Sequence, residues 1–163
     1  ITAELSAEDA VAFLSEENSA ALSEALADSN HAYRAEWDYQ NAECDAAMFL
    51  DYLTYRVDAF ASAEDAQTTL ESGAIQELLA ADGYEESADG PGIFTRAGAK
   101  CDDSDGTQGL QILRRGRYLV TVEASFPQML PEGVTADDVM NQMSLLMGYY
   151  MGDIYGPEIR PQS

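Results

Sequence analysis

The sequence contains very little positive charge. Eight lysines and arginines stand against 30 aspartates and glutamates, so the formal net charge is −22, and Lys100 is the only lysine. Nucleic acids and anionic membrane surfaces are bound through cationic side chains, so this composition argues against both as partners. Such an acidic surface suits a saline or extracellular medium, but solubility together with a genomic preference for arginine also explains it.

Long hydrophobic runs are absent as well. No apolar stretch approaches the roughly 20 residues that a membrane-spanning helix needs, so direct membrane insertion of this segment is not expected. The chain lacks a signal peptide and begins at Ile1 rather than at methionine, which suggests a mature or trimmed chain whose export signal has been removed or was not included. We therefore expect an exported protein, either extracellular or at the cell surface.

Cysteine is scarce. Cys44 and Cys101 are the only two cysteines, and they lack the CxxC spacing of a redox or zinc site. In an exported protein we expect them to form a disulfide. Two buried thiols are the alternative.

Histidine is rarer still. His31 is the only one, so a Ser-His-Asp or Cys-His catalytic arrangement would have to include it. It follows the end of a predicted helix, where a histidine can simply bond terminal carbonyl groups. We therefore assign no catalytic residue and expect that the protein is not an enzyme.

The remaining composition is that of a globular protein. The chain has 163 residues, of which 46% are hydrophobic, enough for one domain that buries a core. We expect residues 1–163 to form a single domain with a loosely ordered tail over 156–163.

The clearest structural signal is the segment Leu110–Phe126. Apolar and polar residues alternate from Tyr118 to Phe126, the period-2 pattern of a strand with one buried face. The preceding turn contains Gly116, which tolerates the positive φ that tight hairpins often require. We expect this hairpin to lie at the centre of the sheet.

The other predicted elements follow from apolar spacing and capping residues. Helices are expected over 6–28, over 63–82 and between Thr135 and Gly156. Further strands are expected over 31–40, where a helix is the alternative, and over 49–60 and 93–96. Loops are expected over 84–92 and 97–109. The order α-β-β-α-β-β-β-α predicts an α+β fold, an antiparallel sheet of about five strands covered by amphipathic helices.

Three parts of the chain together resemble exported bacterial lipoproteins and sensor domains of the PsbP-like α+β type. They are Tyr55–Ala66 (YRVDAFASAEDA), 114–127 (RRGRYLVTVEASFP) and the final amphipathic helix. The resemblance covers roughly Tyr52–Tyr155 and leaves out the N-terminal helix. It implies a non-catalytic ligand-binding, sensing or assembly module, and no functional residue of that group maps onto a position here.

Two further groups of residues are candidates for partner binding. Arg114, Arg115 and Arg117 in the hairpin turn can hold an acidic group of a partner or pair with the chain's own carboxylates. Four methionines of the last helix are spaced by three and four residues and suit an adaptable apolar groove or a soft-metal site: Met140, Met143, Met147 and Met151. The alternative is a helix face packed on the sheet, because Val139, Leu146 and Ile154 share the region.

An acidic loop is the candidate for a calcium ion. Asp102, Asp103 and Asp105 precede Gly106 as in part of a calcium loop, but the twelfth position is Ile112, so the EF-hand pattern fails. An irregular Ca²⁺ site remains one interpretation, and a solvated loop is the other. The fingerprints of dinucleotide sites and P-loops are absent, so no other cofactor is expected.

Taken together, the sequence predicts an exported, non-catalytic binding, sensor or assembly domain of the cell surface. We expect a protein partner or self-association, with a small ligand as an additional option. One alternative is a self-assembling subunit of an extracellular polymer or surface complex. Another is a small carboxylate-dependent hydrolase, which requires a concave pocket containing carboxyl groups of raised pKa.

Overall fold

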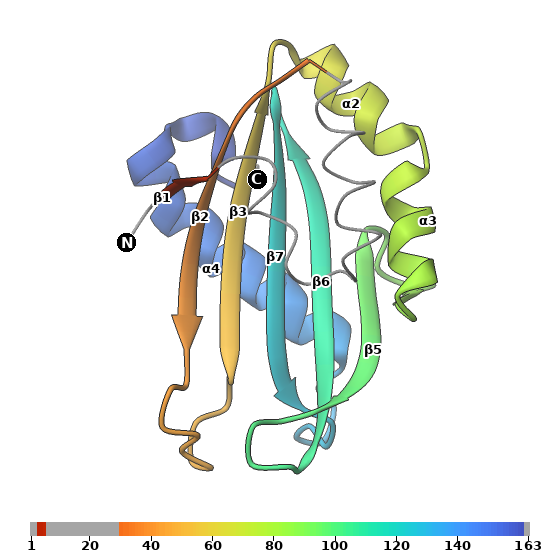
Figure 1. Ribbon diagram of the computed structural model, residues 1–163, viewed down its shortest axis with the longest axis vertical. Coiled ribbons are helices and arrows are strands. Elements are labelled where there is room, and N and C mark those ends of the chain that lie inside the picture. Colours follow the sequence, from red (N-terminus) through yellow and green to blue (C-terminus); the bar gives the residue numbers. More distant parts are fainter. Residues whose placement is uncertain (1–2, 6–29, 162–163) are drawn as a thin grey trace.

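An antiparallel sheet of seven strands organises the fold, in the order β1-β2-β3-β7-β6-β5-β4 (Figure 1). The computed structural model describes residues 3–5 and 30–161, so the predicted helix over 6–28 lies outside the described residues. The strands are β1 (Ala3–Leu5), β2 (His31–Gln40), β3 (Tyr52–Phe60), β4 (Glu85–Glu86), β5 (Ile93–Ala99), β6 (Asp105–Arg115) and β7 (Tyr118–Pro127). The predicted α+β class and antiparallel sheet are confirmed, but the strand count is larger. β1 and β4 are additional, and strands of three and two residues are too short to produce a recognisable alternation.

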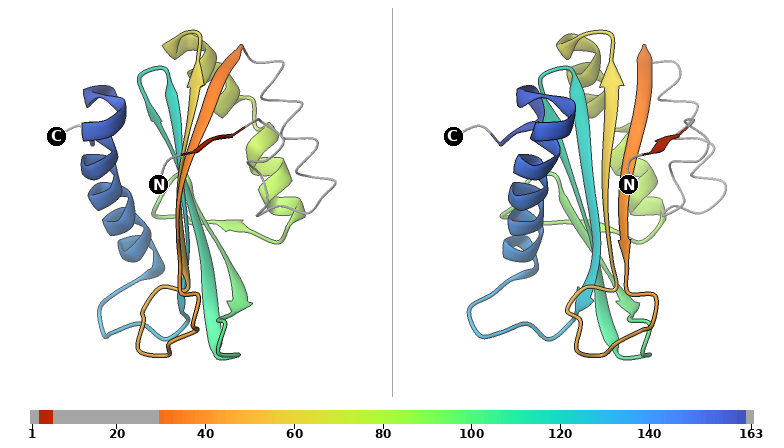
Figure 2. Two further views of the ribbon diagram at one scale, coloured as in Figure 1. Left: turned by 60° about the vertical axis from the view of Figure 1, so that its left-hand side comes forward. Right: turned by 90° about the vertical axis from the view of Figure 1, so that its left-hand side faces the viewer.

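The described helices lie on both faces of the sheet (Figure 2). They are α2 (Ala63–Glu71), α3 (Ala74–Ala81), α4 (Ala136–Tyr155) and the short 3₁₀ helix η1 (Pro157–Ile159). One hydrophobic cluster joins α4 and η1 to the sheet, and a second joins α2 and α3 to the opposite face. None of these helices is long and apolar enough to cross a membrane.

The predicted hairpin is confirmed. β6 and β7 are joined by Gly116 and Arg117, and Gly116 has a φ of +57°. β7 is the middle strand of the seven. Our expectation of one buried face was incomplete, because Val122 packs under α4 while Leu119 packs under α2 and α3.

The predicted helix over 63–82 is instead two helices. Gly73 adopts a φ of +80°, which a helix interior does not allow, and the chain restarts as α3. The predicted N-terminal caps are confirmed. The Ser62 side chain accepts the Asp65 N–H, and Thr135 forms a capping box with Asp138 at the start of α4.

The predicted loop over 97–109 is mostly strand. β5 continues to Ala99 and β6 begins at Asp105, which leaves only 100–104 as a connection. Glycines obscured the alternation here. Gly109 is required by a close approach of α4, because a Cβ at this position would lie 2.5 Å from the Met140 Sδ.

The tail beyond α4 returns to the core. Pro157–Ile159 forms η1, and Ile159 is buried in the hydrophobic cluster between α4 and the sheet. Arg160 forms an ion pair with Asp153 of α4. These contacts place the C-terminal turn against the last part of α4.

Candidate binding site

The sheet face opposite α4 is divided into an apolar and a polar part. Phe60, Leu110 and Leu119 form the apolar part beneath α2 and α3. The polar part follows from the strand register, which places Glu36 beside Arg56 and Thr54 between Asp38 and Glu123. The side chains of β2, β3 and β7 that point away from α4 therefore include several charged groups that lie close together.

A cavity of about 370 Å³ opens on this polar part, and we call it the polar pocket. Its lining comes from five strands that lie side by side in Figure 1. The lining residues are Glu36, Asp38 and Gln40 of β2, Tyr52, Thr54 and Arg56 of β3, Arg96 of β5, Gln108 of β6 and Glu123 of β7. No described helix contributes to it.

Arg56 holds the floor of the polar pocket together. Its Nε donates to Glu36 Oε2 at 2.6 Å, and its Nη1 donates to Glu123 Oε2 at 3.3 Å. The Tyr52 hydroxyl donates to the other oxygen of Glu123 at 3.0 Å. Arg56 and Glu123 are almost fully buried. Buried charges persist only when they are paired and hydrogen-bonded, and this network meets both conditions.

Burial disfavours the charged forms of the acidic groups in the polar pocket. It raises the pKa of the Glu123 carboxyl, although the charge of Arg56 and the hydrogen bond from Tyr52 oppose the shift. Burial likewise raises the pKa of Glu36 against the opposing effect of Arg56. The pKa of the Tyr52 hydroxyl is raised by burial and by the nearby charge of Glu123. An additional cation or hydrogen-bond donor would therefore be stabilised here.

Arg96 forms a second wall of the polar pocket. Its Nε donates to Gln108 Oε1 at 2.5 Å, its Nη1 donates to the Asp82 carbonyl at 2.8 Å, and its guanidinium lies 4.4 Å from the centre of the Tyr84 ring. Among the residues that the structure describes, the buried Tyr84 hydroxyl has no hydrogen-bond partner. Its pKa is raised by burial and then by the charge of Glu123, so the hydroxyl lies near the charges of the pocket.

A smaller cavity of about 300 Å³ adjoins the polar pocket and shares Gln40, Tyr52 and Gln108 with it. It extends toward the predicted disulfide. Cys44 and Cys101 are bridged, which confirms the prediction and ties the β2–β3 connection to the β5–β6 connection. The bridge fixes two connections beside this end of the pocket.

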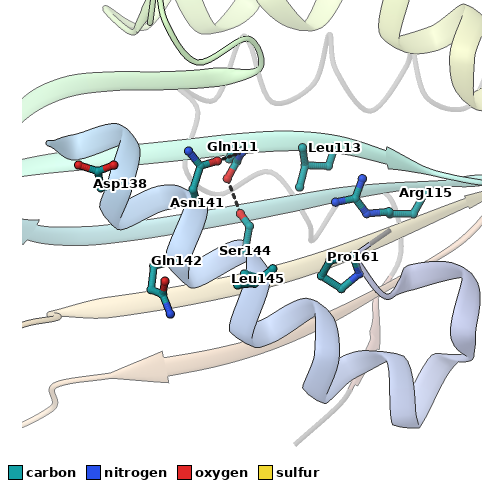
Figure 3. A pocket seen from close by; sticks show the side chains of 9 residues that line it. All are labelled: Gln111, Leu113, Arg115, Asp138, Asn141, Gln142, Ser144, Leu145 and Pro161. Atoms are coloured by element: carbon teal, nitrogen blue, oxygen red, sulfur yellow. Dashed lines mark hydrogen bonds between the residues drawn. The ribbon is translucent and has the colours of Figure 1, made fainter. Parts of the chain in front are cut away.

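A second concave surface lies between β6 and α4, and we call it the β6–α4 groove (Figure 3). Its volume is about 460 Å³, and its lining consists of Gln111, Leu113, Arg115, Asp138, Asn141, Gln142, Ser144, Leu145 and Pro161. The Gln111 amide donates to Asn141 Oδ1 at 3.0 Å and accepts the Ser144 hydroxyl. Figure 3 shows Asp138 at the end where α4 begins and Arg115 near Pro161 at the other.

The three arginines of the hairpin turn lie in different environments. Arg115 lines the β6–α4 groove, and Arg114 is exposed and donates to the Gly116 carbonyl at 3.1 Å. Arg117 donates to the Tyr118 hydroxyl at 3.1 Å and lies over that ring. Within the part of the chain that the structure describes, Arg114 and Arg115 form no ion pair with a carboxylate. Their predicted role in binding an acidic partner stays a prediction.

The methionines of α4 lie mainly toward the sheet. Met140 and Met151 are fully buried, whereas Met143 and Met147 are partly buried against the same core. The two buried side chains fill the space between helix and sheet and cannot line an open groove. The expected inclusion of Leu146 in the packed face was wrong, because this side chain points outward and is 54% exposed.

The acidic loop does not assemble a cation site. Across residues 3–5 and 30–161, no group of three histidine, cysteine or acidic side chains is arranged to hold a metal ion. Asp102 accepts hydrogen bonds from Ser104, which lower its pKa, and Asp103 is exposed. Asp105 belongs to β6 rather than to the loop.

His31 has a carboxylate partner in the sheet. Its Nε2 lies 2.8 Å from Asp58 Oδ1, and its ring meets the ring of Phe60 edge-on. The side chain therefore bonds a carboxylate of β3. The predicted bond to the carbonyl groups of the preceding helix concerns residues 6–28, which lie outside the described residues.

Sequence reasoning missed the polar pocket. The alternation of β3 and β7 correctly separates Arg56 and Glu123 from the apolar residues, but we did not identify that face as a candidate site. The available signal was an arginine opposite acidic residues in neighbouring strands. No protein-family model, curated protein or solved structure matches this chain, so the resemblance to PsbP-like domains also stays a prediction.

Proposed function

We propose that this protein is a non-catalytic binding domain that acts outside the cell, and that its polar pocket holds a small ligand carrying a protonated amine. The observation that carries the proposal is the charge of the lining, where three carboxylates accompany two guanidiniums. Arg56 is shared between Glu36 and Glu123. A ligand ammonium would supply the missing positive charge.

Asp38 is the carboxylate best placed to bind that ammonium. It is exposed on the pocket lining and accepts a hydrogen bond from the Thr54 hydroxyl at 2.9 Å. It forms no ion pair with any other residue that the structure describes. The amides of Gln40 and Gln108 offer further hydrogen bonds for the polar groups of a ligand.

The arrangement favours binding over hydrolysis. Glu36 and Glu123 have the raised pKa values that a carboxylate-dependent hydrolase needs, and they lie in one pocket. However, Arg56 binds both carboxylates, so neither is free to donate a proton to a substrate or to attack it. We therefore place the hydrolase alternative second to a binding role.

The disulfide supports a location outside the cell. Thiols of cytosolic proteins are kept reduced, whereas disulfides persist in secreted and surface proteins. The bridge between Cys44 and Cys101 is consistent with the export that the sequence suggests. The resemblance to PsbP-like sensor and lipoprotein domains favours the same role.

A thermal-shift panel tests the proposal. The probes are putrescine, L-lysine and glucosamine, each compared with an uncharged analogue (1,4-butanediol, a neutral amide and glucose). A ligand present at about 100 times its Kd stabilises the fold by about 2.7 kcal/mol, which for a chain of this size raises Tm by about 5–10 °C. At least one amine should produce this shift, and its neutral analogue should not.

Two variants link the shift to the pocket. Asp38→Asn should remove most of the amine-induced shift because it deletes the proposed anchor. Asp89→Asn is the matched control, since Asp89 is exposed and lies outside the pocket. Equal binding of amines and neutral analogues, or an undiminished shift in Asp38→Asn, would show that the proposal is wrong.

A further inference from the structure

The polar face of the sheet changes in charge from one row of residues to the next. The strand register places Asp38, Thr54 and Glu123 side by side across β2, β3 and β7, and we call them the acidic row. Two positions along the strands, toward the disulfide, lies an uncharged row across β2, β3, β7 and β6. This neutral row consists of Gln40, Tyr52, Ser125 and Gln108. Two residues of a strand span about 7 Å, so the rows are about 7 Å apart.

The neutral row joins the polar pocket to the smaller cavity beside it. Gln40, Tyr52 and Gln108 line both cavities, whereas the acidic row lines the polar pocket alone. Beyond the neutral row, Asn41 and Cys101 line the smaller cavity from the β2–β3 and β5–β6 connections. Figure 1 shows both connections at the same end of the sheet. A ligand that enters the polar pocket can therefore extend along the strands toward the disulfide.

The charge in the smaller cavity is already compensated. Among the described residues that line it, Asp51 is the only charged one. One carboxylate oxygen of Asp51 forms an ion pair with Lys100 at 3.7 Å, and the other accepts the Cys101 N–H at 2.8 Å. Lys100 is buried and also donates to the Met48 carbonyl at 3.2 Å. A ligand ammonium would have to compete with Lys100 for Asp51, so this cavity favours uncharged groups.

The neutral row presents groups that suit hydroxyls. An amide side chain both donates and accepts hydrogen bonds, as a sugar hydroxyl does. Arg96 binds the carbonyl oxygen of Gln108, which leaves the amide nitrogen of that side chain to donate. The hydroxyl of Tyr52 is held by Glu123, so the Tyr52 ring is fixed between the two cavities. An aromatic ring in this place offers an apolar surface on which a sugar ring can pack.

We infer that the ligand is an amino sugar joined to an uncharged sugar, with its ammonium on Asp38 and its second ring in the smaller cavity. This assignment rests on the proposed function, which places an ammonium at Asp38. The two cavities, of about 370 Å³ and about 300 Å³, lie in the size range of pockets that enclose ligands larger than one sugar ring. A linear diamine fits less well, because its second ammonium would reach the ion pair of Asp51 and Lys100.

Isothermal titration calorimetry with lactosamine, in which glucosamine carries an uncharged galactose, tests this assignment. The matched probes are glucosamine, which lacks the second ring, and lactose, which has a hydroxyl in place of the amine. Sodium chloride at about 0.15 M screens the general attraction of amines to the acidic surface. Lactosamine should bind about tenfold more tightly than glucosamine, the gain expected from two further hydrogen bonds. Lactose should show no measurable binding.

Two variants locate the second ring. Gln40→Ala should remove most of the advantage of lactosamine over glucosamine, because Gln40 lies where the two cavities meet. Gln142→Ala is the matched control and should keep that advantage, since Gln142 is exposed on α4, which packs on the other face of the sheet.

The outcomes separate this assignment from the proposed function. Equal affinities for lactosamine and glucosamine, or an advantage that persists in Gln40→Ala, would overturn the assignment while amine binding at Asp38 stands. Tighter binding of putrescine than of lactosamine would overturn it as well and would give the smaller cavity to a second ammonium. Failure of every amine to bind would instead refute the proposed function, and this assignment with it.

Discussion

Removing Arg56 is the most informative perturbation of the fold. Its guanidinium is the cation that both Glu36 and Glu123 contact in the floor of the polar pocket. Arg56→Met keeps much of the aliphatic volume of the side chain but removes the positive charge that compensates these two carboxylates. Breaking a buried ion pair by removing one partner costs about 3–5 kcal/mol. Since natural domains unfold with about 5–15 kcal/mol, this loss is a large part of the total stability.

Urea denaturation followed by circular dichroism measures this loss directly. We expect the unfolding midpoint of Arg56→Met to fall without a large change in slope, and Tm to fall by about 6–20 °C. The triple variant that also carries Glu36→Gln and Glu123→Gln should recover much of the stability, because amides need no counter-charge. Arg114→Met is the control, since Arg114 is exposed and should change stability by less than about 0.5 kcal/mol. A cost for Arg56→Met as small as that of the control would refute the buried network.

Two further predictions concern pH and the disulfide. A carboxyl whose pKa is raised above its usual 4.5 binds its proton more tightly in the folded protein, so its contribution to stability is present below pH 4.5 and is lost as the pH rises through the raised pKa. Glu36 and Glu123 should therefore make the unfolding free energy decrease as the pH rises above 4.5. Urea titrations between about pH 4.5 and pH 7 should show a smaller decrease for Glu123→Gln. An unchanged pH dependence in this variant would contradict the raised pKa of Glu123. Replacing Cys44 and Cys101 by serine opens a bridge with a sequence separation of 57 residues and should cost about 4 kcal/mol in the chain-entropy model, as measured by chemical denaturation. A double variant as stable as the oxidised protein would show that the bridge contributes nothing.

Local patterns predicted much of the sheet. The alternation over His31–Gln40 and Tyr118–Phe126 yielded two strands in the right places, and Gly116 marked the turn between the strands of the hairpin. The capping residues Ser62 and Thr135 marked two helix starts. These features depend on residues that are close together in the sequence, which is why they can be predicted from the sequence alone.

Features that depend on distant parts of the chain were missed. Alternation assigns Arg56 and Glu123 to one face of the sheet, but it does not reveal that this face becomes buried. The orientation of α4 was missed for a related reason. Apolar residues surround much of that helix, so periodicity cannot show that Ser144 faces the sheet and Leu146 faces outward. The Ser144 hydroxyl faces the sheet and donates a hydrogen bond to Gln111 of β6, a residue 33 positions earlier in the sequence.

The central claim is that the polar pocket binds an amine, and chemical-shift mapping by NMR tests it most directly. The ¹⁵N-labelled protein would be titrated with the amine that gives the largest thermal shift. We predict saturable changes concentrated at Asp38, Gln40, Thr54 and Gln108, and their loss in Asp38→Asn. Changes confined to α4, or changes spread evenly over the acidic surface, would contradict a ligand site in the polar pocket.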